Sequence, residues 1–299
     1  MRATAVRSLL LLVLCAGAAR GEEATVEAPA PGTVATETNT SETGASESAL
    51  ERPLIARPAT TSRRFNMDVY ATYVEGLALQ EADDFRGWTV GLDFTLPLTR
   101  AMQLRALLPV RTEGEAVLRA SDEDIDIEGW SGLFDFGTLF FEHQLVGRDG
   151  GANRFAYYLG MGWRTGVLET DTPDKYNHQG RSIHLGGRYE RRFVAGSTVL
   201  VDAEYRSYEI SDDLNPANLN DDRFNLFRLT GAWMGAKRGV LRPAVELTAQ
   251  AVEDWLPVSV VPELFLLTGS TMTVKFGIPV GLTADAPDWG AEMRATLAF

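Results

Sequence analysis

Two side chains in the sequence are spaced for nucleophilic chemistry. Ser182 and His184 are two residues apart, so both project from the same face if this stretch is a β-strand. A serine hydroxyl beside an imidazole is a candidate nucleophile and general base. Spacing identifies no aspartate or asparagine that would orient the imidazole, and the alternative interpretation is a polar patch beside Arg188. We therefore predict that the protein is not an enzyme and has no catalytic residues, and keep a hydrolase as the lesser alternative.

Three histidines and one acidic run are the other candidates for chemistry. His143, His178 and His184 are too dispersed in the sequence to suggest a metal site. The acidic run at 122–128 offers oxygen ligands for Ca²⁺ or Mg²⁺ but lacks the glycine turn of a calcium-binding loop. The sequence contains no Walker loop, CxxC pair or nucleophile elbow. We predict no cofactor and no metal site, with a divalent cation at the acidic run left as an alternative.

The N-terminal residues have the features of an export signal. Arg2 and Arg7 precede an apolar stretch at residues 9–19, and small residues follow up to Gly21. The apolar stretch is too short to span a bilayer, for which about 20 residues are needed. We predict a signal peptide at residues 1–21, which contains Cys15, the only cysteine of the chain. The exported chain would then form no disulfide.

Composition changes after the signal peptide and again near residue 64. Residues 22–63 consist almost entirely of Glu, Ala, Thr, Ser, Pro and Gly, which supply too little apolar surface to compensate for the chain entropy lost on folding. We predict a disordered linker there, either a spacer or a neutral tail. In the whole chain of 299 residues, 41 acidic and 28 basic residues give a net charge of −13. This charge argues against nucleic acid as a partner.

Beyond residue 64, apolar and polar residues alternate with the period of a β-strand that has one apolar face. We count twelve such stretches, near 65–75, 87–98, 101–111, 132–145, 154–166, 181–193, 198–210, 222–234, 240–251, 258–267, 271–283 and 288–299. Most have a length close to the roughly 9–11 residues of a tilted transmembrane strand, whereas about 5–6 residues are typical of soluble sheets. The pattern predicts an all-β fold, an antiparallel transmembrane β-barrel of about twelve strands over residues 64–299. The facing of 132–145 stays open, because both of its faces are aromatic.

The connections between these stretches alternate in length. Long ones at 76–86, 112–131, 167–180 and 211–221 are separated by short ones at 98–100, 146–153, 194–196 and 235–239. The four long connections together hold 16 acidic residues and only three basic ones, Arg86, Arg119 and Lys175. Outer-membrane barrels have long extracellular loops and short periplasmic turns. We therefore predict four long loops that give the extracellular end a negative charge.

The C-terminal residue carries a resemblance to a known class of proteins. Phe299 ends an alternating strand and resembles the C-terminal signal of Gram-negative outer-membrane β-barrels, although Arg294 stands where that signal has a small residue. A shorter stretch at 160–166 (GMGWRTG) is similar to one in outer-membrane transporters linked to the catabolism of aromatic compounds. The resemblance implies location in the outer membrane, contact with its lipid and lipopolysaccharide, and folding by the barrel assembly machinery.

Strand parity places many charged residues opposite the apolar faces. Charged side chains at the bilayer midplane cost about 2–4 kcal/mol each for Arg or Lys, so this face must be an interior. The residues predicted to line the lumen are Asp68, Asp93, Arg105, Arg164, His184, Arg188, Glu190, Arg192, Asp202, Glu204, Arg206, Arg228, Arg242, Glu246, Glu263, Lys275, Glu292 and Arg294. Apart from His184 they comprise eight acids and nine bases.

Nearly balanced charges in the lumen permit two interpretations. They could line a wet channel without strong ion preference, or they could pair across the lumen as a packed ionic core. A channel needs small residues such as Gly91, Thr95, Gly160 and Gly162 to leave an opening. We predict a passive outer-membrane channel or transporter for small solutes. A structural barrel with a sealed core is the first alternative, and a lipid-active hydrolase that uses Ser182 and His184 is the second.

Overall fold

The computed structural model consists of β-strands and their connections. It describes residues 52–78, 82–119, 121–132, 136–147, 151–163, 168–170, 179–211, 223–252 and 255–299. The strands are β1 (Asn66–Leu77), β2 (Ala82–Pro97), β3 (Met102–Leu118), β4 (Glu123–Gly129), β5 (Gly137–Val146), β6 (Asn153–Trp163), β7 (Leu168–Thr170), β8 (Gln179–Arg192), β9 (Thr198–Ser211), β10 (Arg223–Met234), β11 (Leu241–Ala251), β12 (Val258–Leu267), β13 (Met272–Gly277), β14 (Val280–Gly281) and β15 (Trp289–Ala298). No helix in the described part of the chain is long and apolar enough to cross a membrane.

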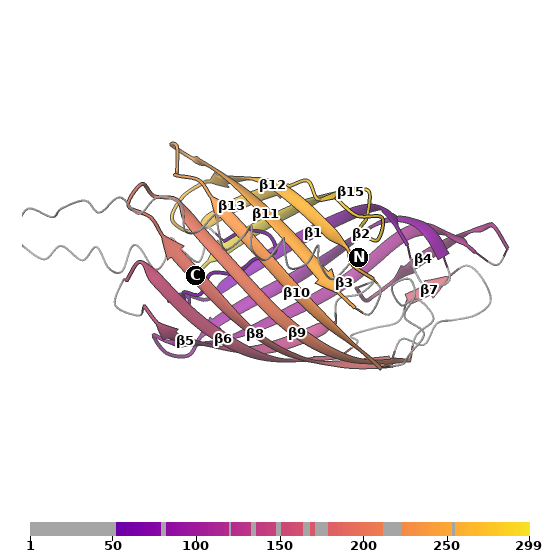
Figure 1. Cartoon of the computed structure of the whole chain (residues 1–299), viewed down its shortest axis with the longest axis horizontal. Coiled ribbons are helices and arrows are strands. Elements are labelled where there is room, and N and C mark those ends of the chain that lie inside the picture. The colour runs from indigo at the N-terminus through magenta and orange to yellow at the C-terminus, as the bar shows by residue number, and fades with distance from the viewer. Residues whose placement is uncertain are drawn as a thin grey trace, which may run out of the picture. The chain divides into compact units, whose positions relative to one another are not determined.

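These strands form one closed antiparallel barrel, in which the strands are steeply tilted (Figure 1). Closure comes from β1, which pairs with β2 on one side and with the last strand, β15, on the other. At three positions around the barrel, two shorter strands lie end to end in place of one long strand. These pairs are β4 and β5, which both pair with β3; β7 and β6, which pair with β4 and β5; and β13 and β14, which both lie between β12 and β15. When each of these positions is counted once, the barrel has twelve strands, which confirms the prediction.

The outside of the barrel is apolar because outward-facing residues alternate with buried polar ones. On β8, Ile183 and Leu185 are exposed while Ser182 and His184 are buried. We call the end where β1 begins and β15 ends the base, and the opposite end the rim. Exposed aromatic side chains lie towards both ends: Trp88, Trp163 and Trp289 towards the rim, and Phe193, Trp233 and Phe299 towards the base. An apolar belt between two aromatic girdles is the surface that a bilayer requires.

The facing of β13 permits a direct test. Phe276 is exposed on the outer face and pairs with Met293 near the middle of β15, whereas Lys275 is fully buried on the inner face. Phe276→Arg is expected to lower the free energy of unfolding by about 2–4 kcal/mol in lipid vesicles, because the new charge faces the bilayer near its midplane. Phe276→Leu controls for loss of the ring. Lys275→Met is expected to cost less, and equal losses in a urea titration would contradict the assignment.

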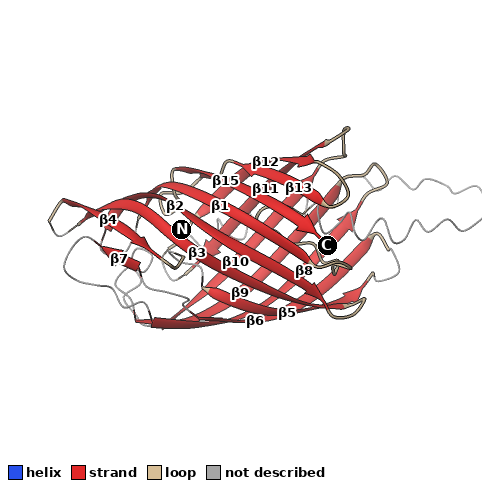
Figure 2. Cartoon of the chain, turned by 180° about the vertical axis from the view of Figure 1, so that it is seen from behind, coloured by secondary structure: helices blue, strands red, loops and turns tan. Residues whose placement is uncertain are grey.

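Two of the predicted long loops are mostly strand. β1 continues to Leu77 and β2 begins at Ala82, so little of 76–86 is loop. The end of β3 pairs with β4 over most of 112–131. Together with β7, this hairpin extends beyond the rest of the barrel (Figure 2). Here acidic residues alternate with the buried Ile125 and Ile127, which pack in an apolar cluster with Phe85, and this alternation is a strand pattern. Most of 167–180 and nearly all of 211–221 lie outside the described residues.

Residues 52–63, which we call the lumen segment, lie inside the barrel. This placement differs from the predicted linker at 22–63, of which 22–51 lies outside the described residues. Arg52, Leu54, Ala56 and Arg57 are all at most 4% exposed. The segment forms no helix or strand, and it is ordered by side-chain acceptors on the barrel wall. Composition suggested disorder for 22–63 as a whole, whereas residues 52–63 include buried apolar residues such as Leu54 and Ala56 beside polar ones that the wall binds.

Candidate functional site in the barrel interior

The polar faces of the strands build the inner wall of the barrel. Buried residues among those predicted to line the lumen are Asp68, Asp93, Arg105, His184, Arg188, Glu190, Asp202, Glu204, Arg242, Glu246, Glu263, Lys275 and Arg294. Half-buried ones are Arg192, Arg206, Arg228 and Glu292. Arg164 lies outside the described residues. Because the outer face is apolar, this burial places the described charges on the inside of the barrel.

The wall pairs many of its own charges, and Arg188 shows how. Its guanidinium group lies 2.9 Å from Glu142 on β5 and 3.1 Å from Asp202 on β9. The same group lies 4.2 Å from the centre of the Tyr158 ring, and the Tyr158 hydroxyl donates to Asp202 at 2.9 Å. The arginine is therefore held by two carboxylates and a ring face, all buried, in an arrangement suited to a guanidinium group.

Several residues of this wall were not among those predicted. Glu142 and Gln103 are buried and hydrogen-bonded to each other at 2.5 Å, and Arg154 lies 3.1 Å from Glu190. Glu142 belongs to the stretch 132–145, whose facing the aromatic residues left open. Its own charge was the available signal, because a carboxylate on a membrane-spanning strand must face inward.

Aromatic rings occupy the space beside three inner-face glycines. The ring of Tyr70 lies over Gly91, that of Phe140 over Gly160 and that of Tyr158 over Gly186, so a β-carbon at Gly186 would lie 2.1 Å from the Tyr158 ring. The expectation that Gly91 and Gly160 leave an opening is therefore wrong. These glycines admit close ring packing from the neighbouring strand and do not widen the lumen.

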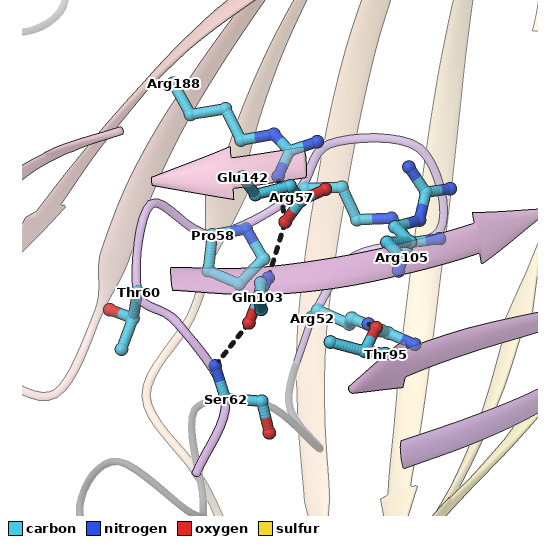
Figure 3. Close-up of a pocket in the computed structure, with 10 residues that line it drawn as sticks. All are labelled: Arg52, Arg57, Pro58, Thr60, Ser62, Thr95, Gln103, Arg105, Glu142 and Arg188. Atoms are coloured by element: carbon cyan, nitrogen blue, oxygen red, sulfur yellow. Dashed lines mark hydrogen bonds and ion pairs between the residues drawn. The ribbon is translucent and has the colours of Figure 1, made fainter. Parts of the chain in front are cut away.

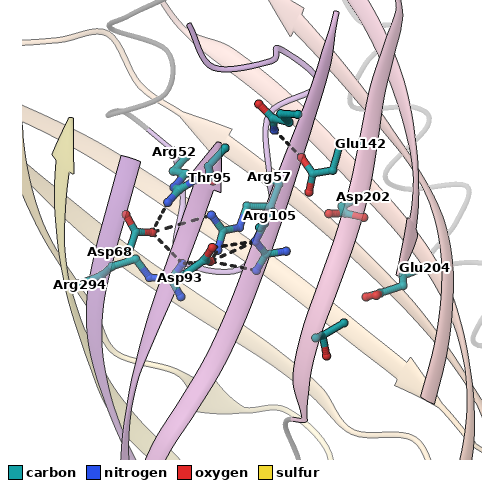
Figure 4. A network of polar contacts seen from close by, with 12 residues as sticks. Arg52, Arg57, Asp68, Asp93, Thr95, Arg105, Glu142, Asp202, Glu204 and Arg294 are labelled. Atoms are coloured by element: carbon teal, nitrogen blue, oxygen red, sulfur yellow. Dashed lines mark hydrogen bonds and ion pairs between the residues drawn. The ribbon is translucent and has the colours of Figure 1, made fainter. Parts of the chain in front are cut away.

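Two arginines fasten the first half of the lumen segment to β1 and β2 (Figure 4). Arg52 donates to Asp68 and, at 3.4 Å, to the Thr95 hydroxyl, and Arg57 donates to Asp93. Asp93 also accepts from the wall residue Arg105, at 3.0 Å. Asp68 and Asp93, which are among the acids predicted to line the lumen, thus have guanidinium groups of the segment among their closest partners.

Backbone amides of the same half are bound on a different part of the wall. Both oxygens of Glu246 on β11 accept consecutive backbone N–H groups, from Ile55 at 2.8 Å and from Ala56 at 2.6 Å. Glu263 on β12 accepts the N–H of Leu54 at 3.2 Å. The carboxylates satisfy amides that the segment, lacking secondary structure, would otherwise bury without partners.

The second half of the segment contacts the wall near the base. Thr60 donates its hydroxyl hydrogen to Glu190 at 2.9 Å. The backbone N–H of Thr61 donates to Gln144 at 3.2 Å, and that of Ser62 donates to Gln103 at 2.6 Å. Together the two halves contact the inner faces of β1, β2, β3, β5, β8, β11 and β12, so the segment crosses the lumen.

A cavity between the segment and the wall has a volume of about 20 Å³ (Figure 3). Its lining includes Arg52, Arg57, Gln103, Arg105 and Glu142. A polar cavity of this size has room for roughly one water molecule. At this level, therefore, the segment and the wall side chains fill the space between them.

The structure supplies the third partner that the spacing of Ser182 and His184 could not identify. Ser182 Oγ lies 2.8 Å from His184 Nε2, and His184 Nδ1 lies 2.9 Å from Glu204 Oε1. Glu204 is also held by Arg206 at 2.9 Å and Arg228 at 2.6 Å. If Nδ1 carries the proton that it donates to Glu204, Nε2 is free to accept the proton of the serine hydroxyl. Glu204 was predicted to line the lumen, but its contact with His184 could not be inferred from the sequence because it lies on the neighbouring strand, 20 residues away.

The other candidates for chemistry do not converge. The acidic run at 122–128 includes most of β4, where Asp124, Asp126 and Glu128 are exposed. His143 lies 3.3 Å from the Tyr157 hydroxyl, away from His184, and His178 is outside the described residues. Within the described ranges, no three His, Cys, Asp or Glu side chains are grouped so that they could hold a metal ion.

Acids dominate the rim, where the strands extend beyond the aromatic girdle. Arg119 lies 2.7 Å from Asp83, and Arg86 lies 2.5 Å from Glu115. The hydrogen bond from Arg119 lowers the pKa of Asp83, which stays ionised at neutral pH. The two arginines that the sequence places among the acids at this end are thus each paired with one of them.

Comparison with known proteins identifies the fold. The translocator domain of the autotransporter NalP from Neisseria meningitidis superposes with a TM-score of 0.53 and 9% identity, over 80% of this chain and 90% of that one. An outer membrane channel from Pseudomonas putida F1 gives 0.52 and 11%, over 79% and 95%. The transport unit of the autotransporter AIDA-I from Escherichia coli gives 0.52 and 9%, over 86% and 98%. The fold is that of an outer-membrane β-barrel.

No protein-family model and no curated protein matches the sequence of this protein. Its fold and its apolar belt agree in placing it in the outer membrane, as the resemblance at Phe299 implied. Phe299 is 68% exposed at the base, beside the Phe65 ring at 5.8 Å. Solved structures at this level of identity show the fold alone, so function has to be argued from the interior.

Proposed function

We propose that the protein is a passive channel for small solutes, closed in this structure by the lumen segment. The observation that carries the proposal is the nature of the segment's contacts. Along both halves of the segment they include hydrogen bonds and ion pairs to a polar wall, which water can replace. A packed ionic core, the alternative that the sequence left open, would pair wall charges across the lumen, whereas Arg188 on β8 pairs with the adjacent β9 and with β5, one strand beyond β6 along the wall.

The wall remains largely paired when the segment is set aside. Three wall arginines would retain their ion pairs with wall acids: Arg105 with Asp93, Arg188 with Glu142 and Asp202, and Arg294 with Glu292. The acceptors that the segment leaves behind would be hydrated in a wet lumen. After removal of the segment, most charges of the wall would still be paired or hydrated, so the wall is expected to stay folded.

Apolar side chains of the segment are buried as well. Leu54 lies against Gly277, Ala56 belongs to an apolar cluster with Phe265, and Ala59 is 2% exposed. Full burial of a leucine side chain contributes about 1.5–3 kcal/mol. These contacts favour the closed state, but departure of the segment does not require the barrel to unfold, because the strands pair with one another and not with the segment.

Planar-bilayer recording of the refolded protein tests the channel proposal. With the segment in place the protein is expected to conduct in rare, brief events, and without the segment it is expected to conduct steadily. A barrel that stays silent in both forms would favour a structural barrel with a sealed core.

One observation favours a second candidate function, hydrolysis of an ester. The chain Ser182–His184–Glu204 has the hydrogen bonds of a nucleophile, a base and an orienting acid. In this reaction Ser182 Oγ attacks the ester carbonyl while His184 Nε2 takes its proton, the alcohol leaves with that proton, and water then releases the acid.

A fluorophosphonate probe, which labels activated serines, tests this second candidate on the folded barrel. If Ser182 is activated, Ser182→Ala is expected to reduce labelling at least tenfold, while Ser207→Ala on the neighbouring strand is expected to leave it unchanged. Equal labelling of the wild type and both variants, or none, would reject the hydrolase.

Partners follow from the location. Phe299, exposed at the base, is proposed as the group that the barrel assembly machinery recognises. The belt would contact membrane lipid, and the rim would contact lipopolysaccharide.

A further inference from the structure

Hydrogen bonds between the lumen segment and the wall run almost entirely in one direction. The segment donates and the wall accepts: Arg52 to Asp68 and Thr95, Leu54 N–H to Glu263, Ile55 and Ala56 N–H to Glu246, Arg57 to Asp93, Thr60 to Glu190, Thr61 to Gln144 and to the Arg100 carbonyl, and Ser62 N–H to Gln103. The exceptions among the described residues are Arg154, which donates to the Thr60 hydroxyl at 2.5 Å, and Asn66 on β1, which donates to the Ser62 hydroxyl at 2.6 Å. The wall thus offers acceptors, mostly carboxylates, along the path of the segment.

Most basic residues of the wall do not reverse this preference, because wall acids engage them. Arg105 lies 3.0 Å from Asp93, Arg188 lies 2.9 Å from Glu142, and Arg294 lies 2.9 Å from Glu292. Lys275 has no hydrogen-bond partner within the described ranges, and it lies against the Phe265 ring, 6.0 Å from its centre. What the wall presents to an occupant of the lumen is therefore chiefly Asp68, Asp93, Glu190, Glu246 and Glu263.

We propose that this inner surface is a binding site for arginine-containing peptides, which the lumen segment occupies as a resident ligand. The inference rests on the proposed function in one respect: the segment must be able to leave. Peptides with the same groups would compete with the segment for the wall, and those that win would be the preferred solutes of the open barrel.

The chemistry selects this class of ligand at two places. Asp68 and Asp93 bind guanidinium groups, and Asp93 Oδ2 accepts from Arg57 and Arg105 at once. Arg52 uses one terminal nitrogen for Asp68 and the other for the Thr95 hydroxyl, a spread that an ammonium group, as a single point charge, does not reproduce. Glu246 uses its two oxygens for two consecutive backbone amides, which requires a peptide backbone with no proline at either position.

Binding of a synthetic peptide tests the proposal independently of conduction. The peptide has the sequence of residues 52–62, RPLIARPATTS, with blocked ends and a fluorescent label. Its anisotropy is measured with a refolded barrel that lacks residues 52–63, in detergent at 0.15 M salt, about physiological ionic strength. We expect saturable binding to this barrel and at least tenfold weaker binding to the wild-type barrel, whose tethered segment competes at high effective concentration.

Matched peptides separate guanidinium recognition from general attraction of cations. Replacing both arginines by glutamine or by lysine is expected to weaken binding at least tenfold, and a scrambled peptide of the same composition is expected to behave similarly. In the barrel, Glu246→Gln is expected to weaken binding of the arginine peptide. Equal binding of the arginine, lysine and scrambled peptides would overturn the proposal, and so would no binding at all.

A second protein variant controls for misfolding of the deletion variant. In the full-length chain, Arg52→Gln with Arg57→Gln keeps the segment but removes its guanidinium groups, so the arginine peptide is expected to bind this variant more tightly than the wild type. Folding of each barrel is checked by its shift in gel mobility on heating. A barrel that conducts but does not distinguish the peptides refutes the binding site alone, whereas one that binds the peptide but never conducts refutes the channel alone.

Discussion

A barrel without residues 52–63 is expected to conduct continuously in a planar bilayer, with a mean current at least tenfold above that of the wild type. At the level of Arg57 and Gln103, the space left between segment and wall is about 20 Å³, enough for roughly one water molecule. Deletion empties the rest of the lumen along the path of the segment. It also removes Arg52 and Arg57 and uncovers Glu246, so the open barrel is expected to prefer cations over anions.

The matched control is a deletion of twelve residues between 30 and 41, which shortens the chain equally and leaves the lumen segment intact. This control is expected to conduct as the wild type does. Selectivity is read from the reversal potential in a salt gradient. Equal currents from the two deletions would show that the segment does not close the lumen, and an anion-selective open barrel would contradict the role of the acceptors.

Substitution of one wall arginine is expected to have the largest effect on stability. Arg188→Met leaves Glu142 and Asp202 buried without their shared partner, and breaking a buried ion pair in this way typically costs about 3–5 kcal/mol. Because Arg188 is 3% exposed and bound on two sides, loss of stability is the expected result at that position.

Arg206→Met is the comparison for this measurement. Arg206 is half-buried, and its partner Glu204 keeps Arg228 at 2.6 Å, so the expected loss is smaller. Adding Glu142→Gln to Arg188→Met should restore part of the stability, because it removes one of the two orphaned charges. Urea unfolding in lipid vesicles measures all three variants, and equal losses for the two arginines would contradict the account.

Strand number, outward facing and membrane location could all be inferred from the sequence, because each depends on local alternation. A residue and its second neighbour share a face whatever the rest of the chain does. Thus Phe276 faces outward and Lys275 inward, as parity predicts. Within 112–131 the same alternation continues through Ile125 and Ile127, and it was overlooked because the acidic residues dominate the composition.

Partnerships across the lumen could not be inferred, since they join residues that are far apart in the chain. Leu54 and Glu263 are separated by 209 positions, and Ile55 and Glu246 by 191. No local pattern distinguishes a carboxylate that will accept these amides from one that will pair with an arginine. Glu204 was missed as the partner of His184 for the same reason, because the pairing of β8 with β9 determines which side chains meet.

By itself, then, the sequence determined a twelve-strand barrel with an apolar outside and a charged inside, because burial of alternate residues is a local property of a strand. Only the tertiary structure decided what the inside contains. The lumen segment is too short to fold alone, and the composition of the stretch 22–63 that contains it indicated disorder. Closure of the barrel surrounds it with acceptors from seven strands, and these hydrogen bonds and ion pairs order the segment together with the burial of its apolar side chains.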